Sequence, residues 1–222
     1  MIQSLSDQEL ARYVSLQLSN FFPDGSPSFE ELILSLSDQV NDRLEKCFNG
    51  LVNRYFSHEG IARFDHLHSE QYGMYLYVLG NEAWKSGPDG GRLATKTYLL
   101  NKALHGFDVF YEITLPPVFW LAHPLGTVLG RAEYGNYFAV MQGCTVGNKA
   151  GVYPKFGERV LLSSHSSVVG NCRIGNDVCI GAGALLIDID VPDGSTVVGR
   201  GSDVRIFAKR AHVLDAIFRA AP

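Results

Sequence analysis

The chain has 222 residues, of which 46% are hydrophobic, and a formal net charge of −4. This is enough apolar material for one large domain, or for one domain with a smaller companion. Acidic and basic residues are interleaved, so the sequence lacks the basic stripe of a nucleic-acid-binding protein, although a few clustered cations could still bind one phosphorylated cofactor.

The first part of the chain has the periodicity of α-helices. Residues 6–9 and 28–31 both read Ser-x-x-Glu, the spacing of a capping box, and an apolar helical face follows each of them. Two further helical runs cover about residues 70–85 and, after a Gly-Pro-Asp-Gly-Gly turn, about residues 93–104. We therefore predict a helical N-terminal domain over residues 1–105.

After about Gly106 the rhythm changes, because apolar residues now recur every six positions. The run comprises Phe156, Leu162, Val168, Ile174, Ile180 and Leu186, and the frame resumes at Val198 and Val204 with Pro192 between. An earlier frame comprises Tyr134, Val140 and Val146, offset by a four-residue insertion near residues 148–154. This period fits neither an α-helix nor an alternating strand, but it fits a β-solenoid in which each hexapeptide forms one short strand and its corner.

The predicted solenoid covers residues 106–206 and points the repeated apolar side chains inward, stacked coil upon coil. The glycines that often follow these residues suit corners with positive φ or close backbone approach. Over residues 207–222, Val213 and Ile217 are one helical turn apart. A short C-terminal helix is therefore expected to cap the last coil, which would otherwise expose its strand edges.

The cysteines form no Cys-x-x-Cys pair, and the histidines add no compact zinc spacing; they are Cys47, Cys144, Cys172 and Cys179. The N-terminus lacks the basic and apolar regions of a signal peptide, and no apolar run reaches membrane-spanning length. We expect a cytoplasmic protein with reduced, packed thiols and no metal.

Several segments of the solenoid resemble serine acetyltransferases. Residues 123–130 read HPLGTVLG and residues 142–147 read QGCTVG, and the similarity continues through residues 153–156, 170–186 and 191–199. The hexapeptide repeat alone is typical of acyltransferases and related solenoids, whereas the His-x-x-Gly-x-x-x-Gly element is more specific. The resemblance implies an α+β chain with a helical N-terminal domain, a left-handed parallel β-helix, and O-acetyltransferase activity with acetyl-CoA as co-substrate.

Acetyl transfer from a thioester to an alcohol needs a base that takes the hydroxyl proton, and histidine suits this task. The resemblance places the catalytic histidine at His123, for which a structural role at a solenoid corner is the competing interpretation. The family orients this histidine with an upstream aspartate, which falls at Asp108 here. Glu112 is the alternative, because Pro116 and Pro117 could shift the register.

The resemblance also implies a CoA site in a groove between neighbouring solenoids. Backbone N–H groups of Gly147 and Asn148 are candidates for stabilising the oxyanion. The small-residue corners of the family fall at Ser163, Ser164, Gly181, Ala182 and Gly183. Candidate ligands of the CoA phosphates are Lys155, Arg200, Arg205 and Lys209. Tight packing at corners and solvated surface charges are the competing explanations for these residues.

The expected acceptor site departs from the family. Ala122 stands where the family has an aspartate, and Val152 and Tyr153 stand where it has an Arg-His pair. These losses weaken recognition of a zwitterion, whereas Trp120 and Tyr153 could stack on a sugar ring. We expect a carbohydrate or other non-amino-acid alcohol as acceptor, with L-serine as the alternative. An N-acyltransferase acting on an amino sugar and a non-catalytic solenoid scaffold are the other hypotheses.

Association with other subunits is also expected. His68 and Glu70 could reach an acceptor bound by a neighbouring subunit, although a helix start with Ser69 as N-cap explains them as well. One solenoid offers only half of a CoA groove, so we expect a homotrimer, or a hexamer that forms through the N-terminal helices. Residues 220–222 lack the terminal isoleucine that the resemblance associates with docking to a partner sulfhydrylase, so no tight complex with that enzyme is expected.

Overall fold

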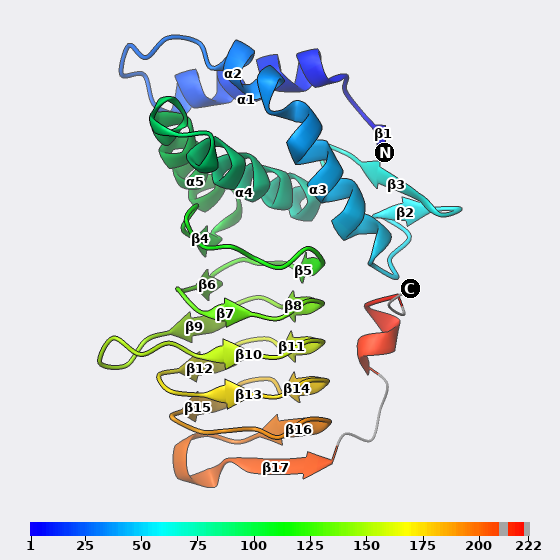
Figure 1. Cartoon of the computed structure of the whole chain (residues 1–222), viewed down its shortest axis with the longest axis vertical. Coiled ribbons are helices and arrows are strands. Elements are labelled where there is room, and N and C mark those ends of the chain that lie inside the picture. The colour runs from blue at the N-terminus through cyan, green and yellow to red at the C-terminus, as the bar shows by residue number, and fades with distance from the viewer. Residues whose placement is uncertain (209–212, 220–222) are drawn as a thin grey trace.

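The computed structural model describes residues 1–208 and 213–219, and it confirms a helical part followed by a parallel β-solenoid (Figure 1). The helices are α1 (Asp7–Phe21), α2 (Glu30–Ser35), α3 (Ser37–Asn49), α4 (Ser69–Lys85) and α5 (Gly91–His105), with a 3₁₀ turn η1 (Pro88–Gly90). Three short strands accompany them, namely β1 (Ile2–Gln3), β2 (Ser57–His58) and β3 (Ile61–Phe64). Within the described ranges, no helix is long and apolar enough to cross a bilayer.

Helix starts followed the sequence only in part. The Ser6–Glu9 capping box of α1 is present in both directions. The second predicted box is wrong, because α2 begins at Glu30 and the Ser28 hydroxyl pairs with Ser15 in the neighbouring helix instead. At the start of α4 the N-cap is His68, so Ser69 is the first helical residue.

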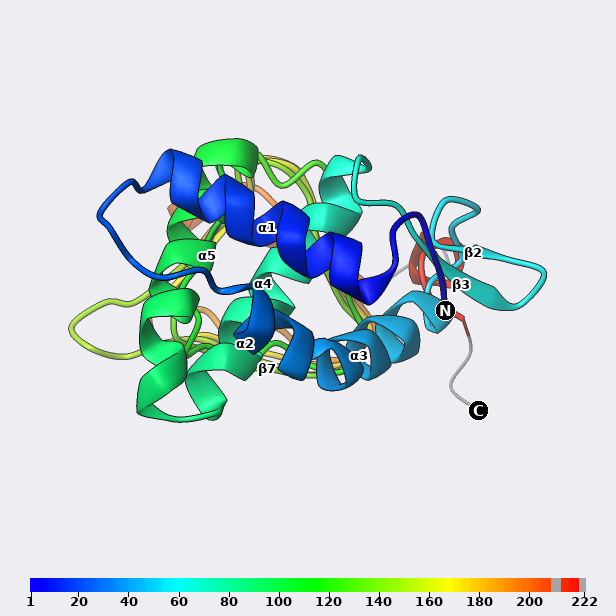
Figure 2. The ribbon, with the colours of Figure 1, turned by 90° about the horizontal axis from the view of Figure 1, so that it is seen from above.

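Helix α4 fixes the helical part to the first solenoid coil. It is buried along most of its length, and it packs against α5 and α3 (Figure 2). The Tyr77 hydroxyl donates to the Ile113 carbonyl at 2.8 Å and accepts from the Leu115 N–H at 2.7 Å. The Asn81 amide donates to the Tyr111 carbonyl at 2.6 Å. These bonds hold the middle of α4 against residues 111–115 of the first coil.

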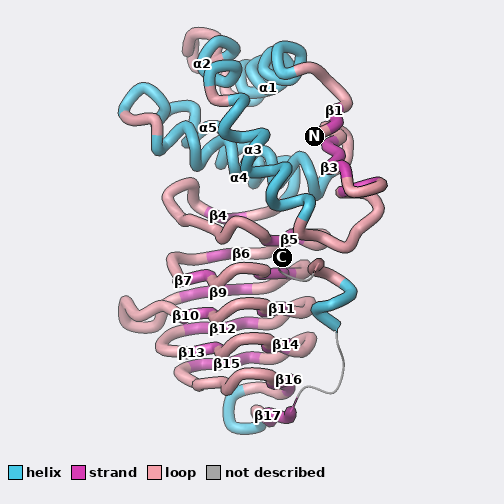
Figure 3. Tube along the Cα trace, turned by 45° about the vertical axis from the view of Figure 1, so that its right-hand side comes forward, coloured by secondary structure: helices cyan, strands magenta, loops and turns pink. Residues whose placement is uncertain are grey.

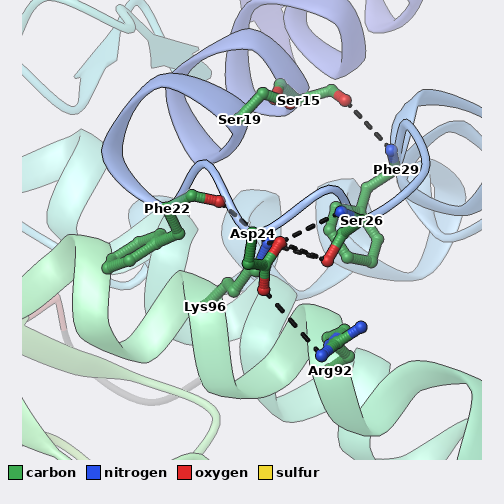
Figure 4. Close-up of polar contacts among 8 residues, drawn as sticks. All are labelled: Ser15, Ser19, Phe22, Asp24, Ser26, Phe29, Arg92 and Lys96. Carbon is green, nitrogen blue, oxygen red and sulfur yellow. Dashed lines mark hydrogen bonds and ion pairs between the residues drawn. The ribbon is translucent and has the colours of Figure 1, made fainter.

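A buried lysine joins α5 to the loop after α1 (Figure 4). The Lys96 ammonium, on a side chain only 7% exposed, donates to Asp24 at 2.7 Å, to Ser26 at 3.0 Å and to the Phe22 carbonyl at 3.3 Å. Hydrogen bonds from Lys96 and Ser26 hold the pKa of Asp24 well below its usual value of 3.8. Because the pKa of Asp24 is depressed in the folded state, this contact contributes its full stabilisation at any pH above the pKa of Asp24 in the unfolded chain. The stabilisation is lost as the pH falls through the lower, folded-state pKa.

The solenoid strands form three parallel sheets, one on each face, whose strands stack in columns (Figure 3). One sheet contains β5 (Phe119–Leu121), β8 (Phe138–Val140), β11 (Val160–Leu162), β14 (Val178–Ile180) and β16 (Ser195–Val198). The second contains β4 (Asp108–Val109), β6 (Val128–Leu129), β9 (Thr145–Gly147), β12 (Ser167–Val169) and β15 (Leu185–Ile187). The third contains β7 (Glu133–Tyr134), β10 (Lys155–Phe156) and β13 (Arg173–Ile174).

The six-residue frame correctly predicted the solenoid core up to Leu186. All six residues of the run from Phe156 to Leu186 are 5% exposed or less, and the four cysteines are buried. The continuation of the frame is wrong, because Ile180 pairs with Val197 and leaves Val198 40% exposed. The last coil is one residue shorter than the frame assumes, which moves the inward position from Val198 to Val197.

The predicted insertion is a hairpin between β9 and β10. Lys149 and Val152 pair antiparallel, and the two residues between them, Ala150 and Gly151, have φ of 51° and 81°. Lys149 also forms an ion pair with Asp188. The hairpin is therefore held against a later coil rather than free.

The structure confirms a short helical element after the solenoid, but this element does not cap the last coil as expected. Strand β17 (Arg205–Ala208) pairs antiparallel with β16 and covers the last strand edge. The 3₁₀ turn η3 (Val213–Ala216) lies back along the solenoid. After it, the backbone of Phe218 forms an antiparallel bridge with Leu51, and the ring centroids of Phe218 and Tyr137 are 5.5 Å apart. The apolar C-terminal segment, with Leu214 and Phe218 buried, packs at the junction with the helical part (Figure 1).

Candidate active site

One edge of the solenoid collects most of the predicted site residues. His123 follows β5, and the corners after β8, β11 and β14 lie below it in the same column, because these strands are hydrogen-bonded neighbours. The predicted CoA residues on this edge are Ser163, Ser164, Gly181, Ala182 and Gly183. The structure therefore brings all five small residues predicted for the CoA groove to the edge that carries His123, whereas Gly147 ends β9 in another sheet.

His123 presents its ring to solvent. Its side chain is 78% exposed, and its backbone has a φ of 49°, in the left-handed region. The same conformation recurs at other corners of this edge, at Gly143, His165 and Gly183, so it is a feature of the solenoid turns. The exposed imidazole is open to contact by a second molecule.

A buried carboxylate lies directly behind His123. Glu70, in the first turn of α4, is 6% exposed, and its Oε1 lies 3.0 Å from His123 Nδ1. The same oxygen accepts the His123 backbone N–H at 3.1 Å, and Oε2 accepts the Trp120 indole N–H at 3.3 Å. An imidazole with Nδ1 against a carboxylate leaves Nε2 available as a base. The sequence offered no signal for this contact beyond the place of Glu70 at a helix start.

The carboxylates predicted from the sequence lie elsewhere in the single chain. Asp108 accepts hydrogen bonds from Tyr98 at 2.8 Å and from Lys102 at 2.7 Å. Glu112 pairs with Arg131 at 2.6 Å. Strand β4, which carries Asp108, belongs to a different sheet from β5, and among the described residues neither carboxylate has a contact with His123.

The predicted acceptor residues are divided between two corners. Trp120 lies beside Glu70, whereas Ala122 is 1% exposed and its N–H bonds to Val140. Tyr153 lies on the hairpin near Gly147, which ends β9, and its hydroxyl accepts from Asn148 at 3.4 Å. Within one chain, the hairpin and Gly147 are thus at a different corner from His123.

The candidate phosphate ligands are spread over the solenoid. Lys155 forms an ion pair with Glu133, whereas Arg200 and Arg205 are exposed near the last coil. Lys209 lies outside the described residues. No group of three or more His, Cys, Asp or Glu side chains in residues 1–208 and 213–219 is arranged to hold a metal ion.

His68 faces a different space from His123. It lines a cavity of about 360 Å³ between β1, β3 and the start of α4, together with Arg54 and Arg63. Its ring lies 5.7 Å from the rings of Tyr55 and Phe56. His68 therefore has no part in the His123 edge of this chain.

The sequence analysis missed a second exposed histidine on the same edge. His165 has a φ of 60° and follows β11 two corners below His123. A Cβ built on Gly143, in the corner between them, would lie 2.2 Å from its Nδ1, so the ring packs over that glycine. The repeat contained the signal, because His165 stands three residues after Leu162, as Gly183 does after Ile180.

No family model matches the chain. In sequence, the chain is 34% identical over 99 residues to the serine acetyltransferase of Bacillus subtilis, a match that covers 42% of this chain and 45% of that one. It is 35% identical over 105 residues to the Helicobacter pylori enzyme, covering 45% of this chain and 61% of the relative. The matched segment thus spans about half the length of these curated relatives.

The solved structures extend the likeness to the helical part. The Neisseria gonorrhoeae serine acetyltransferase has a TM-score of 0.70 at 22% identity, covering 94% of this chain and 82% of that one. The soybean enzyme complexed with serine has a TM-score of 0.70 at 19% identity, with coverages of 92% and 85%. A serine acetyltransferase in complex with CoA has a TM-score of 0.65 at 19% identity, with coverages of 89% and 84%. The chain therefore has the serine acetyltransferase fold, and about half of it is similar to these enzymes in sequence.

Proposed function

We propose that the chain is an acetyl-CoA-dependent O-acetyltransferase and that its acceptor is L-serine. The observation that carries this proposal is the exposed imidazole of His123, with Nδ1 against a buried carboxylate, on the edge of a hexapeptide solenoid. The comparisons support the reaction class, because the relatives named above are serine acetyltransferases.

In the proposed reaction, His123 Nε2 takes the proton of the acceptor hydroxyl while the oxygen attacks the thioester carbonyl. A carbon–oxygen bond forms, and the resulting tetrahedral intermediate collapses with cleavage of the carbon–sulfur bond. The imidazolium returns its proton to the departing CoA thiolate. The chain's own task is to keep Nε2 free and exposed, which the carboxylate beside Nδ1 favours.

We propose that a second copy of the chain completes the CoA groove in a homotrimer. In the sheet next to the His123 edge, the hydrogen-bonded register aligns the uncharged residues Val128, Thr145, Ser167 and Leu185. Asp108 and Arg200 extend this row at its two ends. A neighbouring copy could also bring its Gly147 to the His123 edge.

Light scattering should give the mass of a trimer or hexamer, and Thr145→Lys should shift the protein toward monomer. A monodisperse, active wild-type monomer would contradict this assembly.

The comparisons favour L-serine over the carbohydrate acceptor expected from the sequence. That expectation depended on Ala122, Val152 and Tyr153, of which Ala122 is buried. Val152 and Tyr153 lie on the hairpin beside Gly147, so in the proposed trimer only a neighbouring copy would bring them to His123. Solved neighbours of the chain include serine acetyltransferases complexed with serine. L-serine is therefore the better-supported acceptor.

Steady-state kinetics test the acceptor. We expect kcat/KM for L-serine of about 10⁴ M⁻¹s⁻¹ or more, the range of ordinary enzymes on their own substrates. L-alanine, which lacks only the hydroxyl, is the matched control and should release no CoA thiol. Faster turnover with a sugar or amino sugar would overturn L-serine as the acceptor. If no acceptor in the panel caused release of CoA thiol, the non-catalytic scaffold would be favoured.

A further inference from the structure

We propose that Glu70 is the positioning residue of His123, in the role that the family resemblance gives to Asp108. The inference rests on the proposed O-acetyltransferase function and adds a residue to its machinery. The helical part of the chain would then contribute one residue to the site at the solenoid edge.

The contacts of Glu70 constrain both the backbone and the ring of His123. One oxygen, Oε1, accepts the backbone N–H at 3.1 Å and lies 3.0 Å from Nδ1, so a single atom fixes two points of the same residue. A carboxylate can only accept, so the proposed contact requires the proton on Nδ1. This tautomer leaves the Nε2 lone pair free on a side chain that is 78% exposed.

The surroundings of Glu70 suit a buried negative charge. Its side chain is 8% exposed, and its second oxygen accepts the Trp120 indole N–H at 3.3 Å. Its place in the first turn of α4 sets the carboxylate near the positive end of the helix dipole. A buried charge with these donors can balance the imidazolium that forms during the reaction.

Asp108 is less suited to this role within the chain. Both of its oxygens are engaged, one by Tyr98 and the other by Lys102. Glu70 reaches His123 because α4 is fixed to the first coil by Tyr77 and Asn81. The catalytic pair is thus assembled only where the helical part meets the solenoid.

The first test compares Glu70→Gln with Asp108→Asn in the full-length protein. A glutamine can turn its amide toward Nδ1 and select the wrong tautomer, so kcat should fall by about 10²–10³-fold with little change in KM for acetyl-CoA. Glu70→Asp keeps the charge and should recover part of this loss. Asp108→Asn should cost much less than Glu70→Gln. The reverse order of the two losses would overturn the proposal.

The second test reads the tautomer directly and does not depend on activity. Nitrogen-15 NMR of the wild type should show His123 protonated at Nδ1, and Glu70→Gln should shift the ring toward Nε2 protonation at an unchanged melting temperature. If the wild type acetylated no acceptor but the tautomer responded, the proposed function would fail and the positioning contact would stand. If Glu70→Gln changed neither the His123 tautomer nor the turnover, the positioning role of Glu70 would be rejected while the proposed O-acetyltransferase function would stand.

Discussion

Replacing His123 with alanine is expected to lower kcat for acetyl transfer by about two to four orders of magnitude, the usual contribution of a general base. The fold should persist, because the side chain is exposed and its removal leaves no cavity. The loss should appear in kcat rather than in KM for acetyl-CoA, since the imidazole acts on the acceptor proton in the transition state.

Two further variants separate the imidazole from its backbone. His123→Asn keeps a residue that tolerates the left-handed conformation, so it removes the base with little added strain. His165→Ala removes an exposed imidazole with a similar backbone from the same edge, and its effect on kcat should be far smaller than that of either His123 variant. Turnover near that of the wild type in both His123 variants would remove this residue from the mechanism.

Replacing Gly135 with alanine is expected to destabilise the solenoid by about 3 kcal/mol, the upper range for forcing extra atoms into a packed core. A Cβ at this position would lie 2.2 Å from the Gly157 carbonyl oxygen and 2.3 Å from its carbon. These are backbone atoms of the next coil, so the coils themselves must separate to relieve the overlap. For a chain of this size the melting temperature should fall by about 6–12 °C.

Gly147→Ala is the matched control for this prediction. Gly147 also follows an inward apolar residue of the repeat, but the nearest atom to a Cβ there lies at 3.7 Å, an ordinary contact. Thermal melts followed by circular dichroism should therefore place Gly147→Ala close to the wild type. Equal melting temperatures for the two variants would show that the coils are not in close contact at Gly135.

The solenoid core was predictable because the repeat imposes one inward position every six residues, and coils of equal length keep that position in register. Prediction ended where a coil changed length, as the exchange of Val198 for Val197 shows. Positions 197 and 198 are both valine, so the sequence gives no sign of which of them points inward after the coil is shortened by one residue. The expected capping helix was misplaced for a related reason, since only tertiary packing decides that Phe218 returns to Leu51.

The site was predictable only on the solenoid side. The motif around His123 identifies a base, and the repeat places the small corners of the same edge below it. The contact with Glu70 joins residues 53 positions apart and depends on how α4 sits on the first coil. Periodicity predicts a helix and its first turn, but it carries no information about which solenoid corner that turn meets.

Transfer of a labelled acetyl group tests the central claim most directly. The full-length protein would be incubated with acetyl-CoA carrying carbon-13 in its acetyl group and with L-serine, and the products followed by NMR together with the released thiol. The wild type should form O-acetyl-L-serine in equal amounts with free CoA, and His123→Asn should form neither at a comparable rate. Release of CoA without the labelled ester, or equal ester formation by both proteins, would contradict this account.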